Sequence, residues 1–462
     1  MESMSKKCRS CENNDGIQDR LSGLPDEVIV HILTLMPTLD AVRAMLLRRF
    51  ADLWTLVPAL NFDFGEYSGR MTRINDERLS NHPMFSSFAR FVRNVLMLYR
   101  RSTIDTFYLS IKDVEVELVD AKMIGDVQMW LRFAISKQVK DLYFDCDPLH
   151  DGLCPPHCVF TSQSLAVLTL SHCTLDNFEH QSQPHMGALT KLSLTRVCGT
   201  TNAYDKLLRG CPSLQELFID VSDAPGLLSL NVNAPSVSKL YLHLFSCRCI
   251  LNCPSLKIMD IAVYSKSSPL VPLRATDFIS LQEVNVKILP RRCSYYLVHS
   301  LFGLIENAKV FTLSCEAFKH ITSTKKMEFP QNRWKRIVLH PQWDRERCLQ
   351  VICMLIGSSI NLEELIICAG ESPGKCELAC PKFHTCLLPL LKTVTIHGNH
   401  GYEKWCKGQL QVIEFLLRNA VVLDKLVITL GKSKLTTAEE LDLIKQVSTF
   451  RRASADVTVI FA

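Results

Sequence analysis

Four residues between positions 376 and 386 carry the donor atoms of a zinc site. They are Cys376, Cys380, His384 and Cys386, and thiolate and imidazole are ligands that zinc prefers. Structural zinc sites are usually built from C-x2-C pairs, however, and this group contains none. An insertion between two repeats, with Cys386 turned inward in the following strand, explains the same residues. We therefore predict no metal ion here.

Two smaller groups of cysteine and histidine residues also lack the second ligand pair of a zinc site. Cys8 and Cys11 form a lone C-x2-C in a polar segment, and Cys154, His157 and Cys158 have no second pair nearby. Neither group supplies the four ligands of a closed site.

The sequence contains no arrangement typical of a catalytic centre. It lacks a G-x-S-x-G elbow, a cysteine paired with an orienting histidine, carboxylates beside a glycine loop, and a phosphate-binding loop. His172, His243, His340 and His397 lie beside or within expected strands, where a hydrogen-bonded structural histidine is the common case. We predict a chain that is not an enzyme and that needs no cofactor.

Composition points to a folded protein of a reducing compartment. The 462 residues are 47% hydrophobic and 21% charged, as in ordinary globular proteins. Residues 1–18 are polar, and no run approaches the roughly 18 apolar residues that span a bilayer. The 20 cysteines occur in apolar strand contexts such as Cys173, Cys315 and Cys368, which favours reduced thiols. We expect a cytoplasmic or nuclear protein with no membrane contact.

The charge distribution argues against a nucleic-acid partner. The formal net charge is +5, and the basic residues occur as dispersed pairs such as Arg48-Arg49 and Arg291-Arg292. A nucleic-acid footprint requires a clustered basic surface.

A short apolar helical module follows the polar N-terminal residues. Leu24-Pro25-Asp26-Glu27 suits a first helical turn, because proline fits that position and acids complement the positive helix end. Pro37 ends this helix. A second helix is predicted from Thr38 or Asp40 to Phe50. Fewer than 50 residues cannot bury this many large apolar groups, so the module either binds a partner or caps the repeats that follow.

The rest of the chain contains a leucine repeat. Residues 165–175 match the leucine-rich-repeat template L-x-x-L-x-L-x-x-C-x-L. Two weaker candidates are Val92 with Val95 and Met97, and Ile104 with Phe107 and Leu109. Looser copies of the apolar trio begin at Val139, Leu189, Leu214, Val237, Leu256, Leu281, Ala308, Trp334, Leu362, Leu391 and Leu423.

These repeats predict an α/β fold, an irregular leucine-rich-repeat solenoid with a parallel sheet on its concave side. The residues between the apolar trio positions should face that side. They mix small, aromatic, acidic and aliphatic types, which suits a protein partner. The row is Thr169, Ser193, Phe218, Tyr241, Asp260, Asn285, Thr312, Val338 and Ile366.

The last eighty residues alternate strands and helices. A strand is expected within residues 386–398, a helix within 409–419 and a second strand within 422–430. Thr437 and Glu440 form a possible capping box for a last helix, and an alternating strand follows at Val457, Val459 and Phe461. We expect these elements to cap the solenoid.

The N-terminal module resembles the plant F-box motif. The resemblance rests on Asp19 to Glu27, His31-Ile32-Leu33, Met36-Pro37-Thr38 and Asp40 to Arg43. It implies docking onto a Skp-type adaptor and, through it, a cullin-RING ubiquitin ligase. Carried over by position, the adaptor-facing residues are Leu24, Pro25, Ile29, Ile32, Leu33, Val42 and Trp54.

One feature departs from that family pattern. The second helix reads Leu46-Leu47-Arg48-Arg49-Phe50, one residue short and with phenylalanine in place of tryptophan. On a continuous helix, the loss of one residue rotates everything after it by roughly 100°. Trp54 would then face elsewhere, unless the loss falls in a bend.

The C-terminal segment resembles the FBD domain of plant F-box and leucine-rich-repeat proteins. The resemblance lies in Cys386-Leu387-Leu388, Leu391 to Val394 and Leu416 to Ala420. The expected organisation is a tail at 1–18, an F-box at 19–64, a linker at 65–90, most polar from Gly65 to His82, repeats at 91–383 and an FBD domain at 384–462.

The resemblance implies a substrate-recognition subunit of an SCF-type ligase, with the F-box on a Skp-type adaptor and the repeats on a target protein. The alternative is a ligase-independent protein-binding scaffold with a degenerate F-box. A third reading, a small-molecule receptor, has no basic cluster or pocket signature to support it. The sequence does not identify the substrate-binding residues.

Overall fold

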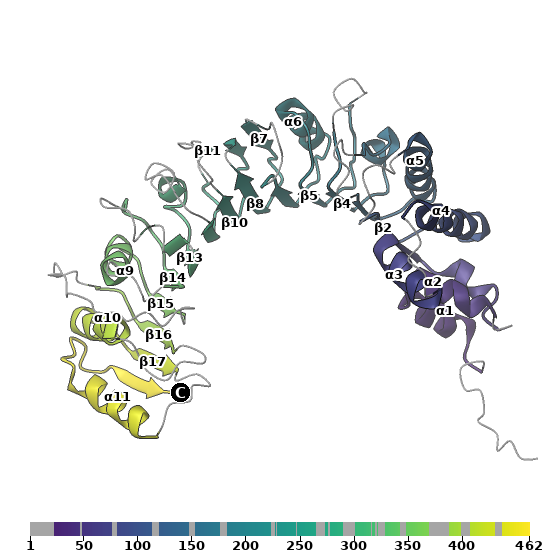
Figure 1. Cartoon of the computed structure of the whole chain (residues 1–462). Helices are drawn as coiled ribbons and strands as arrows, with labels where there is room; N and C mark the ends of the chain where they lie inside the picture. Colours follow the sequence, from purple (N-terminus) through teal and green to yellow (C-terminus); the bar gives the residue numbers. More distant parts are fainter. Residues whose placement is uncertain are drawn as a thin grey trace, which may run out of the picture.

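The computed structural model describes residues 23–46, 49–75, 81–112, 120–146, 153–175, 183–222, 227, 229–245, 247–264, 273–275, 278–289, 301–315, 317–318, 321, 329–341, 348–368, 388–398, 407–429 and 437–462. The chain forms an open arc with its helical module at one end and its C-terminal strands at the other (Figure 1). The zinc-like group from Cys376 to Cys386, with Cys8 and Cys11, lies outside the described residues.

The N-terminal module consists of short helices. Helix α1 (Asp26–Thr34) follows Pro25, carries Asp26 and Glu27 in its first turn, and precedes Pro37. Helix α2 (Thr38–Arg43) is followed by the 3-10 turns η1 (Ala44–Leu46) and η2 (Leu53–Leu56). The prediction of one helix as far as Phe50 is therefore wrong, because the α-helix ends at Arg43.

A single parallel sheet of 15 strands lines the inner side of the arc. Its strands follow chain order, except that β7, β9 and β11 are left out. Buried apolar residues alternate with less buried ones along most strands, as in β4, where Leu168 and Leu170 are fully buried. The strands are β1 (Ala59–Asp63), β2 (Thr106–Ser110), β3 (Asp141–Asp145), β4 (Val167–Ser171), β5 (Lys191–Thr195), β6 (Glu216–Asp220), β8 (Lys239–Phe245), β10 (Ile258–Tyr264), β12 (Glu283–Leu289), β13 (Val310–Leu313), β14 (Arg336–Leu339), β15 (Glu364–Ile367), β16 (Thr393–His397), β17 (Lys425–Thr429) and β18 (Thr458–Phe461).

The outer side of the arc is built from helices and a second small sheet (Figure 1). Strands β7 (Ser229–Asn233), β9 (Arg248–Asn252) and β11 (Leu273–Ala275) pair in the order β11-β9-β7. The leucine-repeat pattern does not predict this second sheet. The helical elements are α5 (Ala121–Ser136), η4 (His157–Thr161), α6 (Thr201–Arg209), α9 (Cys348–Gly357), α10 (Lys407–Asn419) and α11 (Thr437–Thr449).

The predicted repeats are confirmed as strands, with one exception. Each of the eleven looser trios introduces a strand, and Phe107 and Leu109 lie in β2. Val92, Val95 and Met97 lie instead in helix α4 (Asn81–Leu98). Val92, Val95, Leu96 and Tyr99 are buried, and this spacing of three, four and seven is helical.

The segment after the module is not the expected linker. Helix α3 (Phe64–Asn75) begins directly after β1. Ser68, Gly69 and Asn75 gave the segment its loop-like composition, but Phe64 and Tyr67 are buried. Their rings pack against Phe88 of α4 with centroids 5.5 and 5.3 Å away. Tertiary burial of one helical face outweighed the weak local propensity.

Candidate functional site

Three of the predicted adaptor-facing residues form the core of the N-terminal module. Ile29, Leu33 and Trp54 are only 0 to 2% exposed, so the prediction of a surface position is wrong for them. The irregular path after Arg43 absorbs the shortened second helix, and Trp54 in η2 faces inward as a result. Pro25 is exposed, whereas Leu24, Ile32 and Val42 are half-buried.

A different set of apolar side chains reaches the surface of the module. Val28, Leu35 and Met36 of α1 and its C-terminal end are 41, 75 and 39% exposed, and Met45 and Leu46 of η1 are 44 and 85% exposed. Positions 28, 32, 35 and 36 share one helical face. We call Val28, Leu35, Met36, Met45 and Leu46 the exposed apolar set. Sequence spacing alone could not separate this set from the core residues one turn away.

An arginine from the irregular segment ties the module together. The Arg49 guanidinium donates to the carboxylate of Asp26 and to the backbone oxygen of Leu24, the latter at 3.3 Å. Both acceptors lie at the start of α1. The pair holds the segment that follows η1 against the first helix of the module.

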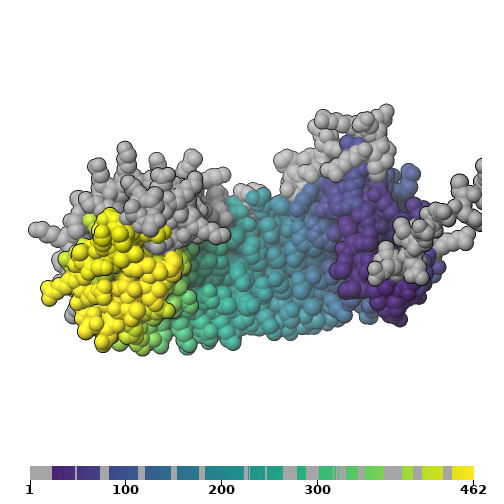
Figure 2. Space-filling view, turned by 90° about the horizontal axis from the view of Figure 1, so that it is seen from below, coloured from purple at the N-terminus to yellow at the C-terminus, as the bar shows by residue number. Residues whose placement is uncertain are grey.

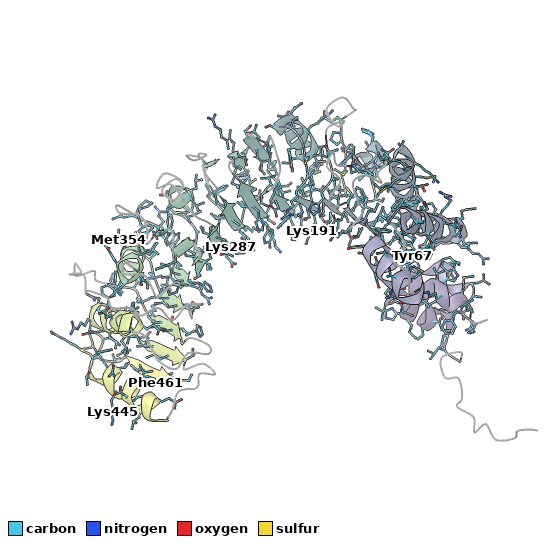
Figure 3. All side chains as sticks on the ribbon, viewed as in Figure 1. Tyr67, Lys191, Lys287, Met354, Lys445 and Phe461 are labelled. Atoms are coloured by element: carbon cyan, nitrogen blue, oxygen red, sulfur yellow. The ribbon has the colours of Figure 1, made fainter. Side chains whose placement is uncertain are left out.

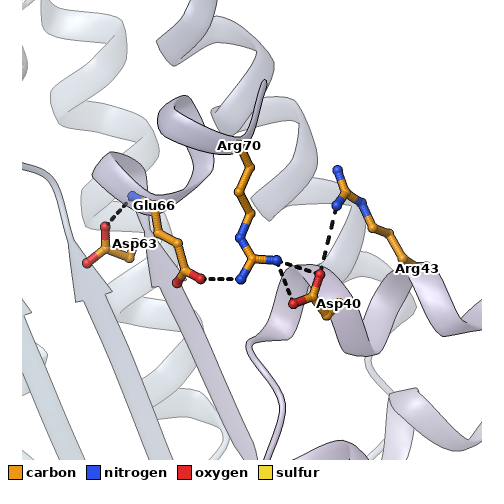
Figure 4. A network of polar contacts seen from close by, with 5 residues as sticks. All are labelled: Asp40, Arg43, Asp63, Glu66 and Arg70. Carbon is orange, nitrogen blue, oxygen red and sulfur yellow. Dashed lines mark hydrogen bonds and ion pairs between the residues drawn. The ribbon is translucent and has the colours of Figure 1, made fainter. Parts of the chain in front are cut away.

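Polar contacts also fix the module to the solenoid (Figure 4). The Arg70 guanidinium of α3 donates to both oxygens of Asp40 in α2, at 2.6 and 2.5 Å, and to Glu66 at 2.5 Å. In addition, the Asn61 N–H of β1 donates to Thr38 Oγ1 at 2.6 Å. This bond satisfies one backbone N–H of β1, the strand at the N-terminal edge of the sheet.

The predicted concave residues lie in one continuous register. Pairing aligns Thr169 with Ser193 and continues to Ile366. Tyr108 and Tyr143 extend the row toward the N-terminal end. Figure 3 shows Lys191 and Lys287 of two strands inside the arc, whereas Met354 of α9 lies outside. The strand residues between core positions therefore face the concave side.

Asp145 is the most highly hydrogen-bonded carboxylate on this face. Its side chain is 3% exposed and contacts His172 Nδ1, Lys112 Nζ and Tyr143 Oη, each at 3.0 Å. Burial acts to raise the pKa of Asp145, but the hydrogen bonds from these three groups hold that pKa below its usual range.

Asp220 forms a second such centre. Its carboxylate lies 3.5 Å from His243 Nδ1 and accepts a hydrogen bond from the Ser222 N–H at 2.9 Å. Burial opposes ionisation, but the hydrogen bonds from His243 and Ser222 prevail and lower the pKa of Asp220 to about 2. His172 and His243 thus each contact a carboxylate, and His397 Nδ1 lies 2.9 Å from Thr429 Oγ1. The prediction that these three histidines are hydrogen-bonded residues is confirmed.

Metal-binding geometry is absent from the part of the chain that the structure describes. No group of three or more histidine, cysteine, aspartate or glutamate side chains there could hold an ion. Seven of the described cysteines are buried. No described helix combines the length and apolar character needed to cross a membrane.

Comparison with known proteins matches two segments of the chain to family models. Residues 127–268 match the leucine-rich repeats of the FBD-associated F-box protein At5g56370, and residues 385–428 match the FBD model. The F-box/FBD/LRR-repeat protein At5g56420 of Arabidopsis thaliana is 26% identical over 96% of this chain and 99% of its own length. The probable FBD-associated F-box protein At1g32375, also of Arabidopsis thaliana, is 22% identical over 96% of this chain and 100% of its own length.

The fold thus defines a leucine-rich-repeat solenoid that carries a helical module at its N-terminal end and FBD strands at its C-terminal end. Over nearly its whole length, the chain is similar to plant proteins of the F-box/FBD/LRR-repeat family.

Proposed function

We propose that this chain is the substrate-recognition subunit of an SCF-type cullin-RING ubiquitin ligase. In this role the N-terminal module binds a Skp-type adaptor, and the concave face binds a target protein. The exposed apolar set is the observation that carries the proposal. Leu35 and Leu46 are 75 and 85% exposed on a module that is fixed to one end of the solenoid, and large exposed apolar groups are typical of a surface that a partner covers.

The chain performs no chemistry of its own in this proposal. Its contribution is proximity, because holding target and ligase in one complex raises their effective concentration to about the millimolar range. The rigid connection between the module and β1 supports this role, since it fixes the distance and angle between the two binding surfaces.

Adaptor binding is tested by co-purification of the full chain with a Skp-type adaptor. We expect the double variant Leu35→Glu, Leu46→Glu to bind at least tenfold more weakly, because two charges would be transferred into an apolar interface. Both side chains are exposed, so the substitutions should leave the fold intact, which circular dichroism verifies. Ile279→Glu is the matched control, because Ile279 is also 85% exposed but lies far along the solenoid.

Two outcomes would count against the proposal. If the double variant binds as well as wild type, the exposed apolar set is not the adaptor surface. If folded wild-type chain does not bind any adaptor, the chain is instead a ligase-independent scaffold. The short α2 helix (Thr38–Arg43) is the feature that favours this second candidate function.

A further inference from the structure

The N-terminal half of the concave face carries two pairs of aromatic rings. Tyr108 of β2 and Tyr143 of β3 stack with centroids 4.2 Å apart and an interplanar angle of 8°. Phe218 of β6 lies 6.5 Å from Tyr241 of β8. All four side chains are half-buried and occupy the central row of the sheet.

Small residues separate the two aromatic pairs. Thr169 of β4 and Ser193 of β5 lie between Tyr143 and Phe218 in the same row. At the usual strand spacing of about 4.8 Å, the two pairs are about 14 Å apart. An extended segment of a partner could therefore contact both pairs at once while passing over the small residues. Figure 2 looks into this side of the arc.

Toward the C-terminal ends of the strands, the charges beside these rings have one sign, whereas the row two residues earlier also contains Lys191 and Lys239. The central row and the row two residues later contain Asp63, Asp145, Asp220 and Asp260 on β1 to β10, and these positions contain no lysine or arginine. This local excess of carboxylates stands out in a chain whose formal net charge is +5. We call the four aromatic and four acidic residues the aromatic-acidic strip.

Only part of this negative charge is neutralised within the chain. Lys112 pairs with Asp145 at 3.0 Å, and Lys287 pairs with Asp260 at 3.1 Å. Asp63 and Asp220 form no ion pair with any lysine or arginine among the described residues. Asp63 accepts the Glu66 N–H, and Asp220 accepts the Ser222 N–H and contacts His243.

We propose that the aromatic-acidic strip binds a basic segment of the target protein, with arginine or lysine side chains over the aromatic rings. Cations are attracted to the faces of aromatic rings. A guanidinium group can also donate to a neighbouring carboxylate while its plane stays stacked. An acidic segment or a nucleic-acid backbone would be repelled by the same carboxylates. This inference rests on the proposed function in one respect: both assume that a target protein binds the concave face.

Because the target is unidentified, the probe is a randomised peptide library selected on the full-length chain. We expect the selected peptides to be enriched in arginine and lysine. A labelled synthetic copy of one such peptide should bind more weakly as ionic strength rises, because salt screens exposed charges.

Variants then locate the binding site. Asp63→Asn combined with Asp220→Asn should weaken binding of this peptide by about tenfold, because two carboxylates lose their charge. Phe218→Ala should weaken binding to a similar extent, because it removes one of the aromatic rings that attract a cation. Asn at position 63 keeps an oxygen that can accept the Glu66 N–H. Val427→Ala, which changes the central row in the FBD strand β17, is the matched control and should bind like wild type. Circular dichroism confirms that each variant is folded.

The outcomes separate this inference from the ligase role. Selected peptides without basic enrichment, or basic peptides that bind the strip variants as well as wild type, would overturn the inference. Adaptor co-purification is measured in parallel. Loss of adaptor binding by a chain that still selects basic peptides would reject the proposed function and leave the inference standing.

Discussion

At the scale of single residues, two carboxylates of the concave face, the buried Asp145 and the half-buried Asp220, have a structural role. Asp145 and Asp220 lie at the last positions of β3 and β6, where the chain leaves the sheet. Each has lost water to burial and has gained hydrogen bonds from neighbouring repeats or the next turn. An ionised carboxylate is favoured in such a site only because these donors replace the lost water.

Asp220→Asn should therefore lower the free energy of unfolding, measured by urea denaturation. The pKa of Asp220 is about 2 in the folded chain against an ordinary value of 3.8. A lowered pKa stabilises the folded state above the unfolded pKa, here by about 2 kcal/mol. This contribution is lost as the pH falls from about 4 toward 2.

The difference in the free energy of unfolding between Asp220→Asn and wild type should thus be largest at pH 6 and fall to roughly half of that value by pH 3. Asp424→Asn, at an exposed aspartate, serves as the control and should show little difference at either pH. A pH-independent difference at position 220 would contradict the assigned role of its charge.

At the scale of elements, the connection of the module to the solenoid depends on α2 and α3. The module follows directly into β1, and the two helices are joined by Arg70, Asp40 and Glu66 (Figure 4). Arg70 donates to both carboxylate oxygens of Asp40 in α2 and is held in place by Glu66 of its own helix. The contact therefore fixes an angle as well as a distance. The expected linker would have left this angle free.

Arg70→Ala should loosen α2 without unfolding the solenoid. We expect faster amide hydrogen exchange in residues 38–43, since the local opening free energy falls by about 1 kcal/mol when the pair is removed. Exchange in β8 and β10 should stay unchanged. Arg43→Ala is the control, because Arg43 lies 3.8 Å from Asp40 and makes the weaker contact. Equal exchange in both variants would show that Arg70 does not hold the module.

At the scale of the whole molecule, the FBD segment is part of the solenoid. Strands β16, β17 and β18 continue the same sheet in register with β15. The Ala453 N–H donates to Leu417 O, and the Ser454 hydroxyl donates to Leu423 O. These bonds join the last turn of the chain to the preceding repeat.

Removal of residues 384–462 should therefore destabilise the remaining chain. It would expose the edge of β15 and the buried side chains Leu365 and Ile367 to water, and terminal units of solenoids usually keep such surfaces covered. We expect aggregation in size-exclusion chromatography and a lower midpoint in urea. A truncated chain that stays monomeric with wild-type stability would show instead that the FBD segment is an independent domain.

The repeating part of the fold can be predicted from local sequence patterns. Alternating apolar residues, as in Leu165 to Leu175, fix which strand face is buried, because the side-chain period of a strand is two. The central concave row followed from that period, and so did the strands of the FBD segment. Helix α1 was also predictable, because Pro25 and the two acidic residues after it mark the start of a helix and Pro37 marks its end. These signals depend only on neighbouring residues.

Tertiary structure alone decided which apolar residues of the module stay exposed and how the module joins the solenoid. Ile29 and Leu35 are both apolar residues of one short segment, yet Ile29 is 0% and Leu35 75% exposed, because packing against η2 covers only one side of α1. The same holds for α3, whose helical form depends on the rings of α4, and for the pairing of Asp40 with Arg70. These contacts join residues distant in the chain, and no local pattern encodes them.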